Sequence, residues 1–316
     1  MAVKLYLTNS TNPYVNLVYE NYLFRKHQNE ESSDQILILW KSAPSIVMGK
    51  FQNPWLECQV KKIRSSGVNL VRRQSGGGCV YHDLGNLNYS FISSKKNYDK
   101  SRNANIIVSA LRELGISAFE NKRHDLRLLH NEVDYKISGC AFKETRSSAL
   151  HHGTLLIDAN LDLLNDLLRS KTQVESALGV KSVSSSVVNL KSIIPLLSED
   201  SIKVAIRKSF ATAYDSNVAV EEISEQEICM LPTLMEQIEF QRSWEQIYGV
   251  TPKFTFKIED ILVTAKHALV VQTSPDRPEL LGLCIDKFFY NDDSVFSSLN
   301  EDQQIFINKC YDFLFV

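Results

Sequence analysis

Three consecutive glycines at residues 76–78 constrain the fold of this chain more than any other feature of its sequence. Such a run permits a backbone path that residues with side chains adopt only at a cost, and it lets amide N–H groups approach a bound anion closely. Arg72 and Arg73 precede the run, and guanidinium groups can bind phosphate or carboxylate oxygens in bidentate fashion. No Gly-Lys-Ser/Thr follows, and Tyr81 stands where a dinucleotide fingerprint needs glycine, so neither of those phosphate loops is present. We therefore interpret the segment as an anion site, against the alternative of a tight β-turn with solvated arginines.

Length and charge narrow the class of protein. The 316 residues correspond to two domains, or to one large domain with an appendage. Thirty-five basic residues against 37 acidic ones give a formal charge of −2, which argues against a dedicated nucleic-acid binder. The six cysteines are far apart and lack a zinc-like spacing, so we expect free thiols in a reducing compartment. No apolar run approaches the roughly 20 residues that a membrane span needs, so no membrane partner is expected.

The hydrophobic pattern predicts a mixture of helices and strands. Helices are expected over residues 12–26, 53–65, 106–114, 161–168, 202–214 and 301–314. Strands are expected over residues 36–40, 45–48, 68–71, 79–82, 87–93, 125–129, 133–138, 141–145, 151–157, 254–257, 261–265, 269–273 and 280–285, the first two as a pair. Because an acidic and polar stretch weakens the pattern from residue 221, we expect a large α+β domain over residues 1–243 and a small α+β domain over residues 244–316.

A lysine near the middle of the chain is a second candidate for chemistry. Lys136 precedes Ser138 and Gly139 at a corner between two expected strands. A lysine on an exposed strand is usually solvated. At such a corner, its ammonium group can instead point into a cleft and stabilise a phosphate or a developing oxyanion. The residues alone leave both interpretations open.

Three further segments carry polar side chains of interest. His151 and His152 are adjacent in an expected strand, where neighbouring side chains face opposite sides, so one metal ion is not expected to bind both. They are either a structural pair, or His152 or Thr154 bonds a ligand. Asp125, at the start of another strand, is either a turn residue or a Mg²⁺ ligand beside a phosphate. The serine-rich residues 179–186 are expected to form a loop that can supply hydroxyl and amide groups.

Taken in order, these segments resemble the lipoate–protein ligase and lipoyltransferase family. The matching residues are Arg72-Arg73-x-x-Gly76-Gly77-Gly78-x-Val80-Tyr81-His82-Asp83-x-Gly85-Asn86, Lys136-Ile137-Ser138-Gly139-x-Ala141 and His151-His152-Gly153-Thr154-Leu155-Leu156, with Gln52-Asn53-Pro54-Trp55-x-Glu57-Cys58 upstream. The strong match covers about residues 45–190. The resemblance implies an α+β catalytic domain of the biotin/lipoate–protein ligase type, with mixed β-sheets flanked by helices, plus a small α+β C-terminal accessory domain.

The resemblance also implies a reaction in two steps. The carboxylate of lipoate or octanoate attacks ATP, with Mg²⁺, to give lipoyl-AMP and pyrophosphate. The ε-amine of a lysine on an acceptor domain then forms an amide. The implied acceptors are the lipoyl domains of 2-oxoacid dehydrogenase E2 subunits and the glycine cleavage H protein. A monomer is implied, in the mitochondrion with its targeting segment absent or removed, or in the cytoplasm if the protein is bacterial.

Site residues follow from the matched motifs. Lys136 is implied as the catalytic cation, and Asp125 as a Mg²⁺ ligand. The residues implied to bind lipoate, ATP or lipoyl-AMP are Arg73, Gly76, Gly77, Gly78, Cys79, Val80, Tyr81, His82, Asn86, Arg123, Lys136, Ile137, Gly139, His152 and Thr154. Among these, Val80, Tyr81 and Ile137 are expected to line the mouth of a dry tunnel for the apolar acyl tail.

One departure affects the activation step. Where bacterial ligases of this family usually carry an arginine in a Ser-Val-x-Ser segment, this chain has Ser184. Animal mitochondrial members mainly perform the second step, so amide transfer is the expected activity and activation by ATP stays open. A transferase would use preformed lipoyl-AMP or a lipoylated carrier protein. Two competing hypotheses are a metal-dependent hydrolase built on His82, Asp83, His151 and His152, and a non-catalytic module that binds lipoyl carriers.

Overall fold

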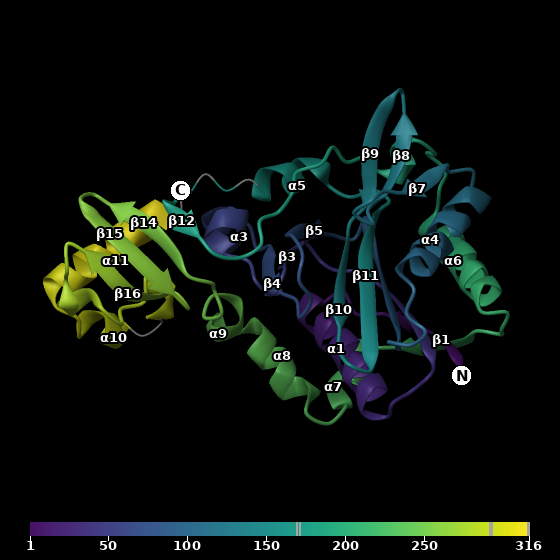
Figure 1. Cartoon of the computed structure of the whole chain (residues 1–316), viewed down its shortest axis with the longest axis horizontal. Helices are drawn as coiled ribbons and strands as arrows, with labels where there is room; N and C mark the ends of the chain where they lie inside the picture. The colour runs from purple at the N-terminus through teal and green to yellow at the C-terminus, as the bar shows by residue number, and fades with distance from the viewer. Residues whose placement is uncertain (169, 171, 291–292, 315–316) are drawn as a thin grey trace.

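A six-stranded mixed sheet organises the larger part of the molecule (Figure 1). The computed structural model describes residues 1–168, 170, 172–290 and 293–314. The sheet order is β10 (Cys140–Glu144), β11 (Ser148–Leu156), β6 (Asn86–Ser94), β2 (Gln35–Trp40), β1 (Val3–Thr8) and β13 (Ala219–Ile223). β1 pairs in parallel with both β2 and β13, and the other pairs are antiparallel. The expected α+β class is therefore confirmed.

Helices cover both faces of this sheet. On one face, α1 (Pro13–Asn29) packs against Ile36, Ile38 and Trp40 of β2. On the other face, α4 (Lys100–Glu113) and α6 (Glu199–Ala213) share a core with Leu37 and Leu39. Because successive side chains of a strand point to opposite faces, a strand covered on both sides is mostly apolar, as β2 is from Ile36 to Trp40.

Two three-stranded sheets carry most of the motifs. The first has the order β4 (Asn69–Arg72), β3 (Ser45–Met48), β5 (Val80–His82), and the glycine run connects β4 to β5. The second has the order β7 (Ala118–Glu120), β8 (Leu126–His130), β9 (Val133–Ser138). The expected pairing of residues 36–40 with 45–48 is wrong, because β1 and β6 occupy both edges of β2 and leave none for β3.

Short helices connect these sheets. The expected helix over residues 53–65 divides into α2 (Pro54–Glu57) and α3 (Val60–Ser65), because Cys58 adopts an extended conformation between them. α5 (Leu161–Leu167) follows β11 as expected. The weakly patterned stretch after residue 221 contains α7 (Glu225–Met230), α8 (Leu234–Arg242) and α9 (Trp244–Ile247), which the sequence pattern did not predict. None of the helices in the described part of the chain is long and apolar enough to cross a bilayer.

The C-terminal part is built on a four-stranded sheet. Its order is β12 (Ser176–Ala177), β14 (Phe254–Ile258), β15 (Ile261–Lys266) and β16 (Leu269–Ser274), with α10 (Asp293–Ser297) and α11 (Glu301–Leu314) nearby (Figure 1). The strand expected over residues 280–285 is wrong, because a 3₁₀ turn at Pro278–Leu280 leaves only an isolated bridge between Leu269 and Cys284. β12 comes from the N-terminal part of the chain, so strands from both parts form this sheet. The division at residue 243 stays a prediction.

Candidate active site

A cavity of about 240 Å³ lies beside the glycine run. Twelve of the residues singled out from the sequence line it: Arg73, Gly77, Gly78, Cys79, Val80, His82, Arg123, Asp125, Lys136, Gly139, His152 and Thr154. A second cavity of about 870 Å³ shares Lys136, Gly139 and Thr154 with the first and extends along α5. The fold therefore brings together segments that are up to about 80 residues apart in the sequence, as their numbers show.

The remaining expected residues lie outside the lining of the first cavity. Tyr81 lines the second cavity instead. The carbonyl of Gly76 accepts a hydrogen bond from Arg73, and Asn86 is buried and donates to Asn88. Ile137 is fully buried in the core that packs α4 and α6 against the sheet, so it lines neither cavity.

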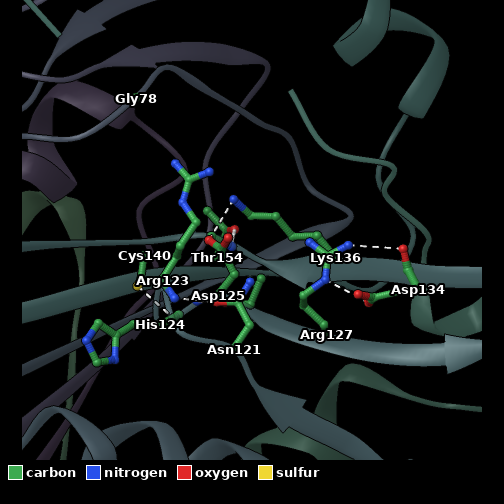
Figure 2. Close-up of polar contacts among 12 residues, drawn as sticks. Gly78, Asn121, Arg123, His124, Asp125, Arg127, Asp134, Lys136, Cys140 and Thr154 are labelled. Atoms are coloured by element: carbon green, nitrogen blue, oxygen red, sulfur yellow. Dashed lines mark hydrogen bonds and ion pairs between the residues drawn. The ribbon is translucent and has the colours of Figure 1, made fainter. Parts of the chain in front are cut away.

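Lys136 lies where the two cavities meet. Its Nζ atom is 2.8 Å from Oδ1 of Asp125, and the lysine side chain is 22% exposed (Figure 2). Gly139 makes room for this side chain, because a Cβ atom there would stand 3.0 Å from Cε and 3.1 Å from Nζ of Lys136. An ammonium group is thus held in place by one carboxylate and remains open to both cavities.

The two arginines before the glycine run hold the protein's own backbone. Nε of Arg73 donates to Oγ of Ser75 (2.9 Å), and its Nη atoms donate to the carbonyls of Val47, Gly76 and Gly78 (3.0, 2.6 and 2.8 Å). Burial lowers the pKa of Arg73 to about 10. The guanidinium group fixes the path of the glycine run, and four of its N–H directions are already used.

Arg72 is directed away from the cavities. It is 1% exposed, and it donates to the carbonyls of Gly49 and Gln52 on one side and of Gln246 and Ile247 on the other. The interpretation that both arginines are free to bind an anion is therefore wrong for Arg72. The positive charge of Arg72 is stabilised by backbone carbonyl groups and not by a ligand.

A buried carboxylate that the sequence motifs did not single out completes this network. Nδ1 of His152 lies 2.8 Å from Oε1 of Glu20, and Nε2 of His152 lies 2.7 Å from Oγ of Ser75. The bonds run in one direction if His152 carries its proton on Nδ1: Arg73 donates to Ser75, Ser75 to His152, and His152 to Glu20. Burial acts to raise the pKa of Glu20, but the hydrogen bonds from His152 and from the Ser90 hydroxyl outweigh it, so the pKa is lowered.

The serine-rich loop is fastened over the glycine run. Oγ of Ser182 accepts hydrogen bonds from the backbone of Cys79 (2.8 Å) and from Nε2 of Gln52 (3.0 Å). The backbone N–H of Ser182 donates to Oε2 of Glu57 (3.0 Å). A Cβ atom on Gly78 would stand 3.2 Å from Oγ of Ser182, so glycine at this position permits the close approach.

Comparison with known proteins decides the family. Residues 12–211 match the lipoyl protein ligase A/B catalytic domain. The chain belongs to this family. It is therefore an enzyme of the lipoate–protein ligase type, and the resemblance found in the sequence motifs is confirmed.

Solved structures of this family are similar over much of the chain. P. falciparum LipL1 in complex with lipoate has a TM-score of 0.68 and 25% sequence identity, over 99% of each chain. A bi-partite lipoate protein ligase and its E2 lipoyl domain from Thermoplasma acidophilum has a TM-score of 0.64 and 24% identity, over 78% of this chain and 96% of that one. A lipoate-protein ligase A bound with ATP has a TM-score of 0.63 and 24% identity, over 78% and 98%.

In this ligase-family chain, the histidines proposed for a hydrolase are buried, and each contacts different side chains. The ring of His82 packs edge-on to Trp40, and that of His151 packs against Phe142, with centroids 5.6 and 4.6 Å apart. Burial lowers the pKa of each to about 3, so both rings are neutral near pH 7. Asp83 accepts hydrogen bonds from the backbone of the turn that follows it and from residue 160.

These contacts remove the basis of the hydrolase hypothesis. Across residues 1–168, 170, 172–290 and 293–314, no group of three or more histidine, cysteine, aspartate or glutamate side chains is arranged to hold a metal ion. Asp125, the expected Mg²⁺ ligand, is paired with Lys136. A single carboxylate such as that of Asp125 is compatible with Mg²⁺, since magnesium in such sites often takes only one or two protein carboxylates and its other ligands would be phosphate oxygens of the substrate and water.

A further cation, Arg123, lines the smaller cavity. Figure 2 shows Arg123 beside Asp125, with its guanidinium group extending toward the side of Gly78. Only its backbone makes a hydrogen bond among the described residues, to Asn121. Arg123 therefore places positive charge at the smaller cavity and the exposed Lys181 places it at both, whereas the uncharged Ser184 lines only the larger cavity.

Proposed function

We propose that this chain transfers a lipoyl or octanoyl group, by way of lipoyl-AMP, onto the ε-amine of a lysine on an acceptor domain. The observation that carries the proposal is the position of Lys136, whose ammonium group opens on both cavities beside the glycine run. Acyl transfer needs one compartment for the acyl chain, another for the nucleotide, and a cation where they join.

The smaller cavity suits the acyl chain. Leu17, Trp40, Val47 and Val80 give it apolar walls, and each buried CH₂ group of a bound chain contributes about 0.8 kcal/mol. The larger cavity suits the adenylate, because its volume of about 870 Å³ has room for a nucleotide, and Ser170, Thr172 and Ser184 line it in addition to the loop residues that both cavities share. In this arrangement the mixed anhydride lies at the lysine.

In the activation step, a carboxylate oxygen of the fatty acid attacks the α-phosphorus of ATP, and pyrophosphate leaves. In the transfer step, the acceptor amine attacks the acyl carbon, the bond to the phosphate oxygen breaks, and AMP leaves as the amine loses a proton. Both transition states gather negative charge on oxygens near Lys136. A preorganised cation there is worth on the order of 3–4 kcal/mol in comparable sites. Asp125 keeps the ammonium group oriented before the substrate binds.

A magnesium ion beside the phosphates would neutralise part of their charge in the first step. Asp125 is the residue of this chain that we propose to hold it. Because the same carboxylate contacts Lys136, the two roles would be coupled: with an ion held at Asp125, the ammonium group would be free to contact the phosphate instead.

A second candidate is a transferase that performs only the second step. The serine at position 184, where bacterial members usually have arginine, favours it. Arg123 lies beside Asp125, where the two cavities meet at Lys136 (Figure 2), and Lys181 lines both cavities. These positions favour the full reaction, because both cations can interact with a triphosphate at the junction. The two candidates share the transfer chemistry and differ only in whether ATP is used.

The experiment supplies the acyl group by two routes. Purified protein is mixed with an apo lipoyl domain and either lipoate, ATP and Mg²⁺ or synthetic lipoyl-AMP, and the acceptor is followed by intact mass. A mass increase by both routes supports the ligase, and an increase only with lipoyl-AMP supports the transferase. No increase by either route contradicts the proposal.

The acceptors that we propose are E2 lipoyl domains and the glycine cleavage H protein. A lipoyl domain of E2 accompanies the archaeal ligase among the similar structures, which supports the first of these. We further propose that the protein acts as a monomer in the mitochondrion, or in the cytoplasm if it is bacterial. Sedimentation of the purified protein and fractionation of cells that produce it test these two points.

A further inference from the structure

One face of the β7–β8–β9 sheet continues outward from the active site. Phe119 pairs with Arg127, Arg127 pairs with Lys136, and Leu129 pairs with Asp134. Directly paired residues, and residues two apart in one strand, lie on the same face of a sheet. These five side chains, the catalytic lysine among them, therefore share one face, and we call it the Lys136 face.

The opposite face is part of the core. Ala118, Leu128 and Ile137 are buried there with the side chains of α4 and α6. On the Lys136 face, the side chains of Lys136 and Arg127 are only 22% and 14% exposed, but Leu129 is 66% exposed and Phe119 is 42% exposed. In Figure 1 the hairpin of β8 and β9 projects from the body of the molecule. Large apolar side chains exposed together beside a functional cavity are typical of a protein-binding surface.

Unpaired positive charge surrounds the same area. The carboxylates of Asp125 and Asp134 form ion pairs with Lys136 and Arg127, and the carboxylate of Glu120 is within hydrogen-bond distance of His124. By contrast, among the residues that the structure describes, no ion pair is recorded for three cations nearby, Lys122, Arg123 and Lys181, or for one carboxylate, Glu132 in the β8–β9 turn, so the unpaired charge is positive on balance. A partner that covers this area is therefore expected to carry acidic groups.

We propose that the Lys136 face docks the acceptor protein. The partner is an acidic domain whose reacting lysine enters the cavity at Lys136, while apolar side chains beside that lysine cover Leu129 and Phe119. Leu129 lies opposite Asp134, two residues from Lys136, which is about 7 Å along the strand. One small domain spans that distance easily. The inference rests on the proposed function, because it assumes that the acyl group goes to a protein lysine.

The test compares two nucleophiles with the same donor. Synthetic lipoyl-AMP is supplied to the full-length protein, and the acyl group is captured either by an apo E2 lipoyl domain or by hydroxylamine, which needs no docking surface. The variants are Leu129→Ser, Phe119→Ser and the double variant. The control is Val271→Ser, which replaces a side chain that is 47% exposed on β16, at the other end of the molecule (Figure 1).

We expect the KM for the lipoyl domain to rise about tenfold or more in the double variant, with hydroxamate formation unchanged within twofold and the control equal to wild type. An unchanged KM in the double variant overturns the docking proposal. An equal loss with both nucleophiles also overturns it, because the residues then support the cavity and not the partner. A wild-type protein that makes neither product overturns the proposed function itself.

Salt provides a second measurement on the same surface. Raising the ionic strength from about 0.05 M to 0.5 M shortens the Debye length from about 14 Å to 4 Å. The KM for the lipoyl domain is expected to rise, and Lys122→Ala is expected to reduce that dependence, while the reaction with uncharged hydroxylamine stays constant. A KM for the lipoyl domain that does not change with salt contradicts the acidic partner.

Discussion

At the residue scale, the hydrogen-bond chain from Arg73 to Glu20 has a measurable role. Ser75 is its central member, and its hydroxyl contacts both Arg73 and His152. We expect Ser75→Ala to lower the free energy of unfolding by about 1–3 kcal/mol, because a buried guanidinium N–H loses its acceptor. It should also weaken binding of lipoyl-AMP, since Arg73 fixes the carbonyls of the glycine run.

Denaturant unfolding and calorimetric titration with a non-hydrolysable lipoyl-AMP analogue measure the two effects. Ser65→Ala is the matched control, because the Ser65 hydroxyl donates only to a carbonyl one helical turn away, at the surface. Equal stability and affinity in the two serine variants would show that the chain from Arg73 to Glu20 has no influence on the site.

The lowered pKa values of two buried histidines, His82 and His151, make the free energy of unfolding depend on pH. Burial lowers the pKa of His82 and of His151 to about 3, against about 6.5 in the unfolded chain. As the pH falls below 6.5, the unfolded chain therefore takes up protons that the folded chain does not. The contribution is fully present above pH 6.5 and is lost progressively as the pH falls toward 3.

Replacing one of these two histidines shows how much it contributes to the pH dependence of the unfolding free energy. In His151→Phe the fall in unfolding free energy between pH 7.5 and 5.0 should be smaller than in wild type, by the uptake of about one proton. Phenylalanine suits the position because Phe91 and Phe142 surround the ring. Denaturant titrations at the two pH values give the difference directly, and an identical fall in both proteins would contradict a neutral buried His151.

The sequence predicted single residues well where they stand in a compact motif. Lys136 and the glycine run were identified, and the fold brings them to one cavity. Glu20 was not, because it depends on His152, far away in the chain. The role of Arg73 was not either, because a motif does not show whether a guanidinium group binds a ligand or the carbonyls of its own loop. Glu20 also gave little local signal, because the buried residues of α1 include the polar Asn16, Asn21 and His27 beside it.

At the scale of elements, the three glycines of the run are not equivalent. Gly77 has a φ of +86°, and a Cβ atom on it would stand 3.0 Å from Nη2 of Arg73. Gly76 has no atom within 4 Å of such a Cβ and an ordinary φ. We expect Gly77→Ala to cost about 1–2 kcal/mol of stability and to reduce lipoyl transfer more than tenfold, and Gly76→Ala to leave transfer within threefold. The rate of lipoyl transfer from lipoyl-AMP to a lipoyl domain is measured for both variants. Equal rates in the two alanine variants would contradict the different roles given to Gly76 and Gly77.

Elements were easier to predict than their pairing. Local periodicity located most helices and strands within a few residues, but it carries no information about which strand edges are free. The order along the chain therefore suggested β2 and β3 as neighbours although they lie in different sheets. β13 is exposed along most of its length and pairs only with β1, some 200 residues earlier in the chain, so no alternating pattern marked it.

At the scale of the whole molecule, one core joins the two parts of the chain. Met48, Trp55 and Tyr81 are buried in the same cluster as Phe254 and Ile307. Arg72 bonds to the backbone of both parts, and β12 adds a strand to the C-terminal sheet. We expect a protein ending at residue 243 to expose this core and to lose cooperative thermal unfolding, as measured by calorimetry. A sharp transition close to that of the full chain would show instead that the first part folds alone.

The most direct test of the account concerns the ammonium group at the junction of the cavities. Single-turnover transfer from saturating lipoyl-AMP to a lipoyl domain is measured for the wild type and for Lys136→Ala, with melting temperatures as the control for folding. If the cation stabilises the transition state by about 3–4 kcal/mol, the rate should fall by roughly a hundredfold to a thousandfold at an unchanged melting temperature. A folded variant that transfers within threefold of the wild-type rate would contradict the account.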